Sequence, residues 1–462
     1  MPEYEHNTIV KADLEKTFSW FENNGSFRRL MPPWEVSEEV RADDSLTDGS
    51  QRVFRFPFGP IKMTWVAEHS DYNPPNSFSD RMIKGPFRSW EHDHQFTHQN
   101  GETTVRDHVT YQAPFGALGN FADSILGGQL MRRRIERMFT ARELRLIRDL
   151  QRHSEFEHLP RKRILIAGSS GLIGTQLVAF LDTGEHDVWR LVRREVREGE
   201  KEISWNPKDE IIDSSEIDGF DIVIHLGGAG IGDKRWTKKR KEIIIESRKS
   251  STTLLSDALS QVQNKPDVFI VASAIGYYGD RGDEILTEES NPGEGFLTET
   301  TIAWESYADS AREAGIRVIN IRNGIVLSAV GGALGRMLLP WKLGAGGSIG
   351  NGKQWMSWIS MDDEIYAIHH LAMSEDTEGA YNLTAPNPSQ QKSFAKSLGR
   401  VLRRPAFAPI PKISMRILFG ELAGPLLFEG QHVLPDRLKK SGYKFTHENL
   451  EDALRDSLGM WN

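Results

Sequence analysis

The sequence predicts an α/β fold with a parallel sheet in its second half, preceded by a smaller α+β domain in its first half. From Arg163 onward, short apolar runs alternate with helical patterns, as do strands that helices cover on both faces. Residues 1 to 150 show a series of strand-like segments and then one long helical segment, which is typical of an antiparallel α+β domain. The chain has 462 residues, more than one ordinary core holds, so two domains are expected.

The composition is typical of a folded globular protein and excludes several kinds of site. Hydrophobic residues make up 38% of the chain and charged residues 26%, and the formal net charge of -8 argues against nucleic acid as a partner. The absence of cysteine excludes disulfides, thiolate catalysis and cysteine-based zinc sites. The start MPEYEHNTIV lacks the features of a signal peptide, and no apolar run approaches the roughly 18 residues of a membrane span. We therefore expect a cytoplasmic protein with no membrane span.

The first half begins with an extended stretch, YEHNTIVKA, and a short amphipathic helix in DLEKTFSWFEN. In the later segment IKMTWVA the bulky residues Ile61, Met63 and Trp65 alternate, as one buried face of a sheet requires. A long helical segment from Ala117 to Arg152 closes this half. Further strands are expected in QRVFRFPF, FSDRMIK, RSWEHDHQF and TTVRDHVTYQ. We expect one domain over residues 1–150, a polar linker over 151–160, and a second domain over 161–462.

Two patterns in the first half are compatible with function but have plainer explanations. EHDHQFTH places His92, His94 and His98 on one face of a strand, and three histidines can bind zinc. A solvated strand face explains the same spacing, and we expect no metal there. The arginine-rich helix from Met131 to Arg152 could face nucleic acid. In an acidic protein a closing helix with solvated arginines is favoured, and we expect no nucleic-acid partner.

The strongest local signal is RILIAGSSGLIGTQLVAFL, a glycine loop between a strand pattern and a helix pattern. Its three glycines would allow a tight turn, a close approach of backbone to pyrophosphate, and close packing of helix on strand. The pyrophosphate would then lie at the positive N-terminal end of the helix. The alternative is an ordinary glycine-rich turn. The spacing predicts a dinucleotide-binding Rossmann fold with a cofactor contact at Gly168, Ser170, Gly171, Leu172, Ile173 and Gly174.

The second strand pattern ends in LVRRE, which bears on the choice of dinucleotide. Arg193 and Arg194 stand where an acidic residue would bind the ribose 2′-hydroxyl of NAD. Arginine suits a 2′-phosphate, through charge-assisted hydrogen bonds. A solvated basic turn is the alternative, and Glu195 keeps NAD(H) possible. We expect NADP(H) in preference to NAD(H).

Six motifs follow one another over the second half of the chain: AGSSGLIG, HLGGAGIGDKRWT, VASAIGYYGDRGDEILTEES, WESYA, IRNGIVLS and NGKQWMSWISMDDE. Through them residues 163 to 460 resemble the extended branch of the short-chain dehydrogenase/reductase superfamily. Within it they are similar to an atypical family named after nucleoside-diphosphate-sugar epimerases. The resemblance implies a Rossmann fold with a C-terminal substrate-binding part. It also implies that the backbone of HLGGAG, namely Leu226, Gly227, Gly228 and Ala229, lines the cofactor groove.

The chain departs from that superfamily at the residues that usually transfer the proton. The superfamily uses a tyrosine and a lysine four residues later, because an unassisted phenol is a poor base at neutral pH. Alignment through WE in PGEGFLTETTIAWESYAD puts Leu297 and Thr301 at these two positions. We therefore expect the usual proton transfer to be absent. Glu299 and Glu305 are expected on the helix surface.

Other side chains could take over the chemistry. Ser273, Tyr277 and Tyr278, in VASAIGYYGD, follow the fourth strand pattern, where ligands gather in open α/β sheets. Packing of the two tyrosines is the alternative. Lys234, Arg235 and Trp236, in DKRWT, could hold an anionic or planar substrate, with a solvated loop as the alternative.

The first half resembles the START-like, helix-grip superfamily that includes polyketide cyclases, through the order of its elements and through LMPPWE. The resemblance implies an apolar ligand between the sheet and the long helix, and a filled core is the alternative. For the whole chain we expect an NADP(H)-dependent oxidoreductase or epimerase-like enzyme with a small-molecule substrate. The alternative is a non-catalytic NADP(H)-binding sensor or scaffold with a lipophilic-ligand domain.

Overall fold

The chain divides into two compact units, each with its own sheet. The computed structural model describes residues 1–43, 45–58, 61–112 and 129–461. One unit consists of Met1–Pro160 and Ala179–His186, and the other of Arg161–Val178 and Asp187–Asn462. The first sheet is antiparallel and the second is parallel, which confirms the predicted fold class.

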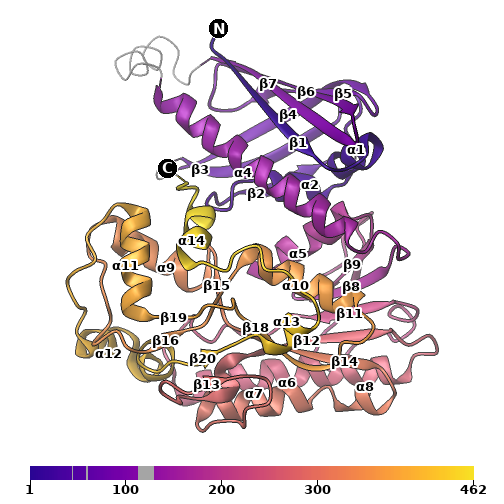
Figure 1. Ribbon diagram of the computed structural model, residues 1–462. Helices are drawn as coiled ribbons and strands as arrows, with labels where there is room; N and C mark the ends of the chain where they lie inside the picture. Colours follow the sequence, from indigo (N-terminus) through magenta and orange to yellow (C-terminus); the bar gives the residue numbers. More distant parts are fainter. Residues whose placement is uncertain (44, 59–60, 113–128, 462) are drawn as a thin grey trace. The chain divides into compact units, whose positions relative to one another are not determined.

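The first unit is a seven-stranded antiparallel sheet, in the order β1-β7-β6-β5-β4-β3-β2, with the long helix α4 lying across one face (Figure 1). Alternate residues of β6 and β7 are buried, because successive side chains of a strand point to opposite faces. The first twelve residues of the predicted closing helix, 117–128, lie outside the described residues, and α4 continues to Ser154, into the predicted linker. The elements are β1 (Glu3–Val10), α1 (Leu14–Glu22), α2 (Gly25–Leu30), β2 (Glu38–Ala42), β3 (Gln51–Phe58), β4 (Ile61–Asn73), β5 (Ser77–Lys84), β6 (Ser89–Gln99), β7 (Glu102–Gln112) and α4 (Gln129–Ser154).

Two predictions about solvated side chains in this unit are wrong in part. His98 is exposed as predicted, and so are Arg132, Arg133 and Arg134 at the start of α4, but other members of both groups are buried. His92 and His94 are only 3% and 4% exposed, because they lie on the face of β6 that also carries the buried Trp90 and Phe96. Their environment is described below.

On α4, Arg145 and Arg152 are buried as well. The nearby Asp149 forms an ion pair of 2.6 Å with Arg29 of α2, and neither of these two side chains is exposed. A buried charge is tolerated when it has a partner of opposite sign. The pairing of Asp149 with Arg29 therefore allows this part of α4 to place charged side chains in the protein interior.

The second unit contains a seven-stranded parallel sheet in the order β10-β9-β8-β11-β12-β14-β18. The chain runs outward from β8 in one direction and then returns to β11 on its other side. In doubly wound sheets ligands bind at the carboxyl ends of the strands where the order reverses, here between β8 and β11. The strands are β8 (Arg163–Ala167), β9 (Asp187–Val192), β10 (Glu202–Ser204), β11 (Ile222–His225), β12 (Val268–Ala274), β14 (Arg317–Asn323) and β18 (Gly379–Leu383).

Helices cover both faces of this sheet, with α6, α7 and α8 on one side and α5 and α10 on the other (Figure 1). The central strands are accordingly buried and mostly apolar, as in β11, whose four residues are all buried. Within the described residues, no helix has both the length and the apolar character needed to cross a membrane. The helices are α5 (Leu172–Thr183), α6 (Lys238–Gln261), α7 (Phe296–Ser306), α8 (Asp309–Glu313) and α10 (Met361–Met373).

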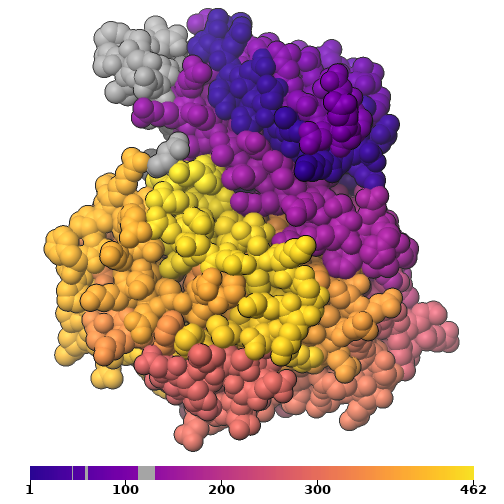
Figure 2. All heavy atoms as spheres, viewed as in Figure 1, coloured from indigo at the N-terminus to yellow at the C-terminus, as the bar shows by residue number. Residues whose placement is uncertain are grey.

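The C-terminal residues form a smaller part of the second unit, and they occupy much of the face of this unit that Figure 2 shows, where they are orange and yellow. Its core contains Trp358, Phe394, Leu398 and Leu454, from a short strand and two helices that are distant in sequence. Its elements are β13 (Ile285–Leu286) paired with β20 (His432–Val433), β15 (Ile325–Leu327) with β17 (Trp358–Ser360), β16 (Trp355–Met356) with β19 (Ser389–Gln390), and α9 (Gly332–Lys342), α11 (Gln391–Leu402), α12 (Lys412–Phe419), α13 (Asp436–Lys440) and α14 (Leu450–Leu458).

Candidate cofactor and active site

The glycine loop between β8 and α5 has the geometry of a phosphate cradle. Gly168 has a φ of +84°, and a Cβ atom there would come within 2.8 Å of the backbone nitrogen of Gly227. A Cβ atom on Gly174 would lie 2.3 Å from the carbonyl oxygen of Gly168, so the helix can approach the loop only with glycine there. At Gly171 the nearest atom would be that same oxygen, at 3.2 Å, and the space beyond is open to a ligand. These three environments fit the three glycine roles of a dinucleotide site.

The turn that follows β11 lies beside this cradle and is held by a buried histidine. The backbone N–H of Gly227 donates to Nδ1 of His225 (3.3 Å), and Nε2 of His225 lies 2.9 Å from the Ser251 hydroxyl. Burial, and then the charge of Arg248, lower the pKa of His225 to about 4, so the imidazole is neutral and can accept at Nδ1. His225 thereby fixes the turn, although the sequence analysis did not single it out.

The backbone donors of the turn are largely used within the protein. Leu226 donates to the carbonyl of Ala167 (2.8 Å), and Ala229 donates to the Ser247 hydroxyl (3.0 Å). With Gly227 bound to His225, three of the four residues predicted to line the groove have their N–H groups occupied. The turn can therefore border a cofactor through close packing more than through hydrogen bonds.

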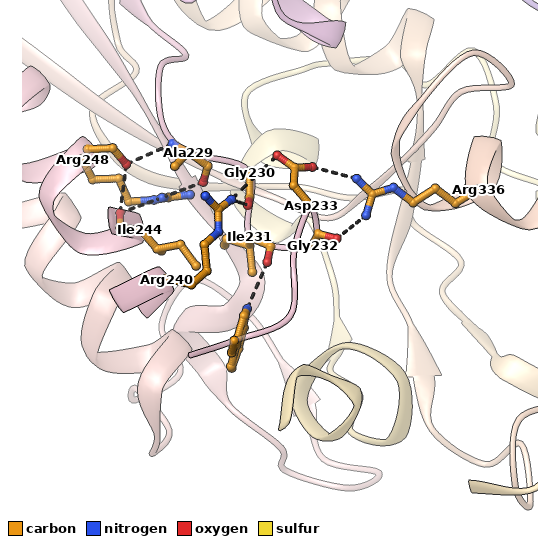
Figure 3. Close-up of polar contacts among 11 residues, drawn as sticks. Ala229, Gly230, Ile231, Gly232, Asp233, Arg240, Ile244, Arg248 and Arg336 are labelled. Atoms are coloured by element: carbon orange, nitrogen blue, oxygen red, sulfur yellow. Dashed lines mark hydrogen bonds and ion pairs between the residues drawn. The ribbon is translucent and has the colours of Figure 1, made fainter. Parts of the chain in front are cut away.

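Three arginines hold the loop that continues from this turn (Figure 3). Arg248 of α6 donates to the carbonyl oxygen of Ala229 (3.1 Å), and Arg240 of the same helix donates to that of Gly230. Arg336 of α9 donates to the carbonyl oxygen of Gly232 and forms an ion pair of 2.7 Å with Asp233. The loop is thus fixed by side chains from two helices that are far apart in sequence.

Two of these arginines, Arg240 and Arg248, give the site an excess of positive charge over nearby carboxylates. Burial, and then the neighbouring Arg240, lower the pKa of Arg248 to about 10, a value at which it is still cationic at neutral pH. The Nε atoms of both Arg240 and Arg248 are buried and have no hydrogen-bond partner among the described residues. The only carboxylate within ion-pair distance of either, in the described part of the chain, is Asp233, at 3.9 Å from Arg240. This side of the site is suited to an anion.

The two arginines after β9 are in different situations. Arg194 makes two hydrogen bonds to Glu202, of 2.6 and 2.8 Å, and the side chain of Glu202 is completely buried. The hydrogen bond to Glu202 raises the pKa of Arg194. Arg193 is exposed and has no hydrogen bond or ion pair with any residue in the described ranges. Arg193 is therefore the freer of the two for a phosphate.

A buried ion pair lies at the carboxyl end of β12. Glu305 of α7 accepts two hydrogen bonds from Arg322 of β14, of 2.8 and 2.9 Å, and one from the Ser273 hydroxyl, of 2.6 Å. Burial opposes the charge of Arg322, but Glu305 outweighs it and raises the pKa of this arginine. The expectation of Glu305 on the helix surface is wrong, since its side chain is 14% exposed. Its position in WESYA gave no indication that Arg322, in IRNG, would face it.

The two tyrosines after β12 have different environments. Tyr278 is fully buried, receives a hydrogen bond from Arg322 (3.0 Å) and donates one to the side chain of Asn382 (2.7 Å). Burial raises the pKa of Tyr278 to about 12. Tyr277 is half-buried, with the guanidinium of Arg322 at 3.4 Å from the centre of its ring. Its hydroxyl makes no hydrogen bond to any described residue, so it can meet a ligand.

The positions of the usual tyrosine and lysine face the same short turn, η1 (Ile275–Tyr278). A Cβ atom on Gly276 would lie 3.2 Å from Cβ of Leu297 and 3.7 Å from Oγ1 of Thr301. The Thr301 hydroxyl donates to the carbonyl of Leu297 (2.6 Å) inside α7. Leu297 therefore packs against the turn instead of presenting a proton donor.

The three residues predicted to bind substrate lie in three environments. Arg235 donates to the carbonyl oxygens of Ile417 and Leu418, with 2.8 Å to the latter. Trp236 is 6% exposed and its indole donates to the carbonyl of Ile231 (3.0 Å). Lys234 is exposed. The substrate roles stay predictions, and Lys234 is the one of the three whose side chain makes no hydrogen bond or ion pair with a described residue.

Comparison with known proteins matches each half of the chain to a family. The model of the NAD dependent epimerase/dehydratase family matches residues 164–384, that of polyketide cyclase / dehydrase and lipid transport matches residues 10–156, and a domain of unknown function (DUF1731) matches residues 410–457. An epimerase family protein of Mycobacterium bovis is 37% identical over 291 residues, which cover 63% of this chain and 96% of that protein.

Solved structures agree with these matches. The nucleoside-diphosphate sugar epimerase from Corynebacterium glutamicum is 30% identical, with a TM-score of 0.79 over 99% of this chain and 90% of that chain. The human epimerase family protein SDR39U1, solved with NADPH, is 30% identical, with a TM-score of 0.58 over 64% of this chain and 99% of that chain. From the relatives that it covers almost completely and from the site just described, this chain belongs to the NAD dependent epimerase/dehydratase family and carries a polyketide cyclase-like domain ahead of its Rossmann domain.

Proposed function

We propose that the chain is an NADP(H)-dependent enzyme that transfers hydride to or from a small anionic molecule. The observation that carries the proposal is the glycine cradle of Gly168, Gly171 and Gly174 at the switch point of the sheet. The bound nicotinamide would supply the hydride chemistry. The cationic side chains of Arg240 and Arg248, with one carboxylate within ion-pair distance among the described residues, support an anionic substrate, because an excess of positive charge attracts a carboxylate or a phosphate.

Tyr277 is the residue we assign to proton transfer. Its hydroxyl is free, it lies at the end of β12, and Arg322 is stacked 3.4 Å from the centre of its ring. Negative charge that develops on the phenol oxygen during proton transfer would be stabilised by this fixed cation. Glu305 keeps Arg322 in position, and the Ser273 hydroxyl is directed onto Glu305. Arg322 would thus do electrostatically what the superfamily's lysine does.

The preference for NADP(H) should depend on Arg193 more than on Arg194. We expect Arg193→Ala to weaken NADPH binding about 10- to 100-fold and to leave NADH binding nearly unchanged, because one charge-assisted hydrogen bond to phosphate contributes about 1.5–3 kcal/mol. Arg194→Ala is the matched control, since its guanidinium is already bound to Glu202. The affinities are measured by titration with NADPH and NADH, following energy transfer from tryptophan to nicotinamide. Equal affinities of the wild-type protein for both dinucleotides would contradict the preference.

The same titration tests dinucleotide binding itself. The Gly171→Asp variant places a carboxylate in the open space above the cradle, where it would repel pyrophosphate, and should bind neither dinucleotide. If the wild-type protein binds neither, the proposed function is wrong.

A second candidate function is a non-catalytic NADP(H)-binding sensor or scaffold. Leu297 against the turn and the fully bonded Tyr278 hydroxyl favour it, because neither can transfer a proton. The two functions are separated by incubating the protein with NADPH and a panel of small carbonyl compounds that carry a carboxylate or a phosphate. Oxidation of NADPH that Tyr277→Phe abolishes supports the enzyme, and tight binding without turnover over the whole panel supports the sensor.

A further inference from the structure

The inward face of the first unit's sheet holds a cluster of two histidines and two aspartates that the proposed function does not use. The strand register brings them together: Asp80 of β5 is paired with His92 of β6, and Asp107 of β7 is paired with His94 of β6. Because His92 and His94 are two residues apart, both point to the same face. The side chains of His92 and His94 are 3% and 4% exposed, and those of Asp107 and Asp80 are 10% and 17% exposed. The cluster is therefore nearly enclosed by the protein.

One aspartate and the two histidines surround a common point. Oδ2 of Asp80 lies 3.2 Å from Nδ1 of His92 and 3.6 Å from Nε2 of His94. One ligand atom from each of the three residues can be chosen so that all lie within 4.8 Å of one another. Four ligands at about 2.0–2.1 Å from a tetrahedral zinc ion are separated by about 3.3–3.4 Å. The two distances to Asp80 are close to that separation.

The second aspartate holds the opposite sides of both rings. Oδ1 of Asp107 accepts a hydrogen bond from Nε2 of His92 (3.0 Å) and lies 2.7 Å from Nδ1 of His94. Histidines that bind metal generally give their other ring nitrogen to a carboxylate, which orients the ring and increases its basicity. Asp107 is in this position toward both histidines.

Aromatic side chains pack against both imidazole rings, and the charges around the cluster do not cancel. Phe78 is stacked on His94, with ring centres 4.1 Å apart, and Phe139 of α4 meets His92 edge-on. The nitrogen Nδ1 of His94 is buried and faces Oδ1 of Asp107 at 2.7 Å without the alignment of a good hydrogen bond, so stacking on Phe78 acts together with Asp107 to orient this ring. Arg142 of α4 is the arginine whose charge acts on both aspartates, and His69 of β4 lies beside Asp80. The carboxylates of Asp80 and Asp107 carry more negative charge than the one guanidinium of Arg142 neutralises, so the cluster can accept another positive charge.

We propose that Asp80, His92 and His94 bind a divalent transition-metal ion of the zinc class, with Asp107 as the residue that orients both histidines. Two imidazoles and one carboxylate are a ligand set that zinc and iron(II) accept, and three protein ligands leave a coordination position open. The site lies in the first unit and does not depend on the proposed dinucleotide chemistry.

The test uses the full chain, produced without a histidine tag, stripped with a chelator and titrated with Zn²⁺ against a competing indicator. We expect one tightly bound ion per chain, and substitution by Co²⁺ should give the intense visible bands of a tetrahedral site. Asp80→Asn and His94→Gln should each lose the ion. Asp107→Asn should weaken binding about 10- to 100-fold and shift the Co²⁺ bands, because it acts through the histidines.

His108→Ala is the matched control. His108 lies on the opposite face of β7, also between two carboxylates, with Glu3 and Asp93 both at 3.7 Å, but its side chain is 30% exposed. This variant should bind the ion as the wild type does.

Failure of the wild-type chain to bind Zn²⁺ would overturn the proposal and identify the cluster as an ion-pair network that a proton completes. Retention of the ion by both Asp80→Asn and His94→Gln would also overturn it. Should either variant fail to fold, thermal unfolding of the wild-type chain decides, because an ion that binds only the folded state must raise the transition temperature of the first unit.

Discussion

The Glu364→Gln variant should be more stable than the wild-type protein by about 3–4 kcal/mol at pH 8 and nearly equal to it at pH 4.5. Glu364 of α10 is completely buried, and neither of its carboxylate oxygens has a hydrogen-bond partner among the described residues. Burial raises the pKa of Glu364 from 4.5 to about 8. The folded state therefore keeps a proton that the unfolded chain releases, so stability falls as the pH rises from 4.5 toward 8.

Glutamine has the shape of the protonated carboxyl group and cannot ionise, so the variant should lack this part of the pH dependence. Denaturant unfolding of both proteins at a series of pH values between 4.5 and 8 measures the difference. Glu305→Gln is the contrasting variant: it removes the charge from a carboxylate that is paired with Arg322, and it should destabilise the protein. If the free energy of unfolding depends on pH in the same way for Glu364→Gln and the wild type, Glu364 ionises at its ordinary pKa and the prediction is wrong.

Tyr277→Phe should lower kcat/KM about 10²- to 10⁴-fold, the usual contribution of general acid–base catalysis, while NADPH affinity and stability change little. The reason is that the Tyr277 hydroxyl has no partner among the described residues, whereas its ring, which packs under Arg322, is retained in phenylalanine. The measurement is steady-state turnover with the first substrate that supports NADPH oxidation, together with a thermal unfolding curve.

Tyr278→Phe gives the opposite pattern and is the control. Its hydroxyl joins Arg322 to Asn382 in a buried network, so its loss should cost about 1–3 kcal/mol of stability. Full activity in Tyr277→Phe would remove Tyr277 from the mechanism, and full activity in a variant that carries both Tyr277→Phe and Tyr278→Phe would remove both tyrosines.

Local sequence patterns predicted much of the fold and the glycine turn between β8 and α5. The continuous apolar runs after Arg163 predicted a parallel sheet covered on both faces. The alternation in IKMTWVA predicted a strand there, but the buried face expected from it is wrong, since Ile61 is 59% exposed and Met63 and Trp65 are only half-buried. The glycine spacing predicted the cradle, because the roles of Gly168 and Gly174 depend on backbone conformation and on neighbours close in sequence. The preference for NADP(H), the cytoplasmic location and an apolar ligand in the first unit stay predictions.

The sequence by itself determined most of the strands and helices and the tight glycine turn between β8 and α5, since these follow from periodicity and from glycine. Only the tertiary structure decided which polar side chains meet. Glu305 and Arg322 come from α7 and β14, and Asp80, His92, His94 and Asp107 come from three neighbouring strands. From its residue type alone, a charged side chain on a helix or a strand is expected to be solvated. Whether it is instead buried depends on a partner that the register of the sheet and the packing of helices bring to it.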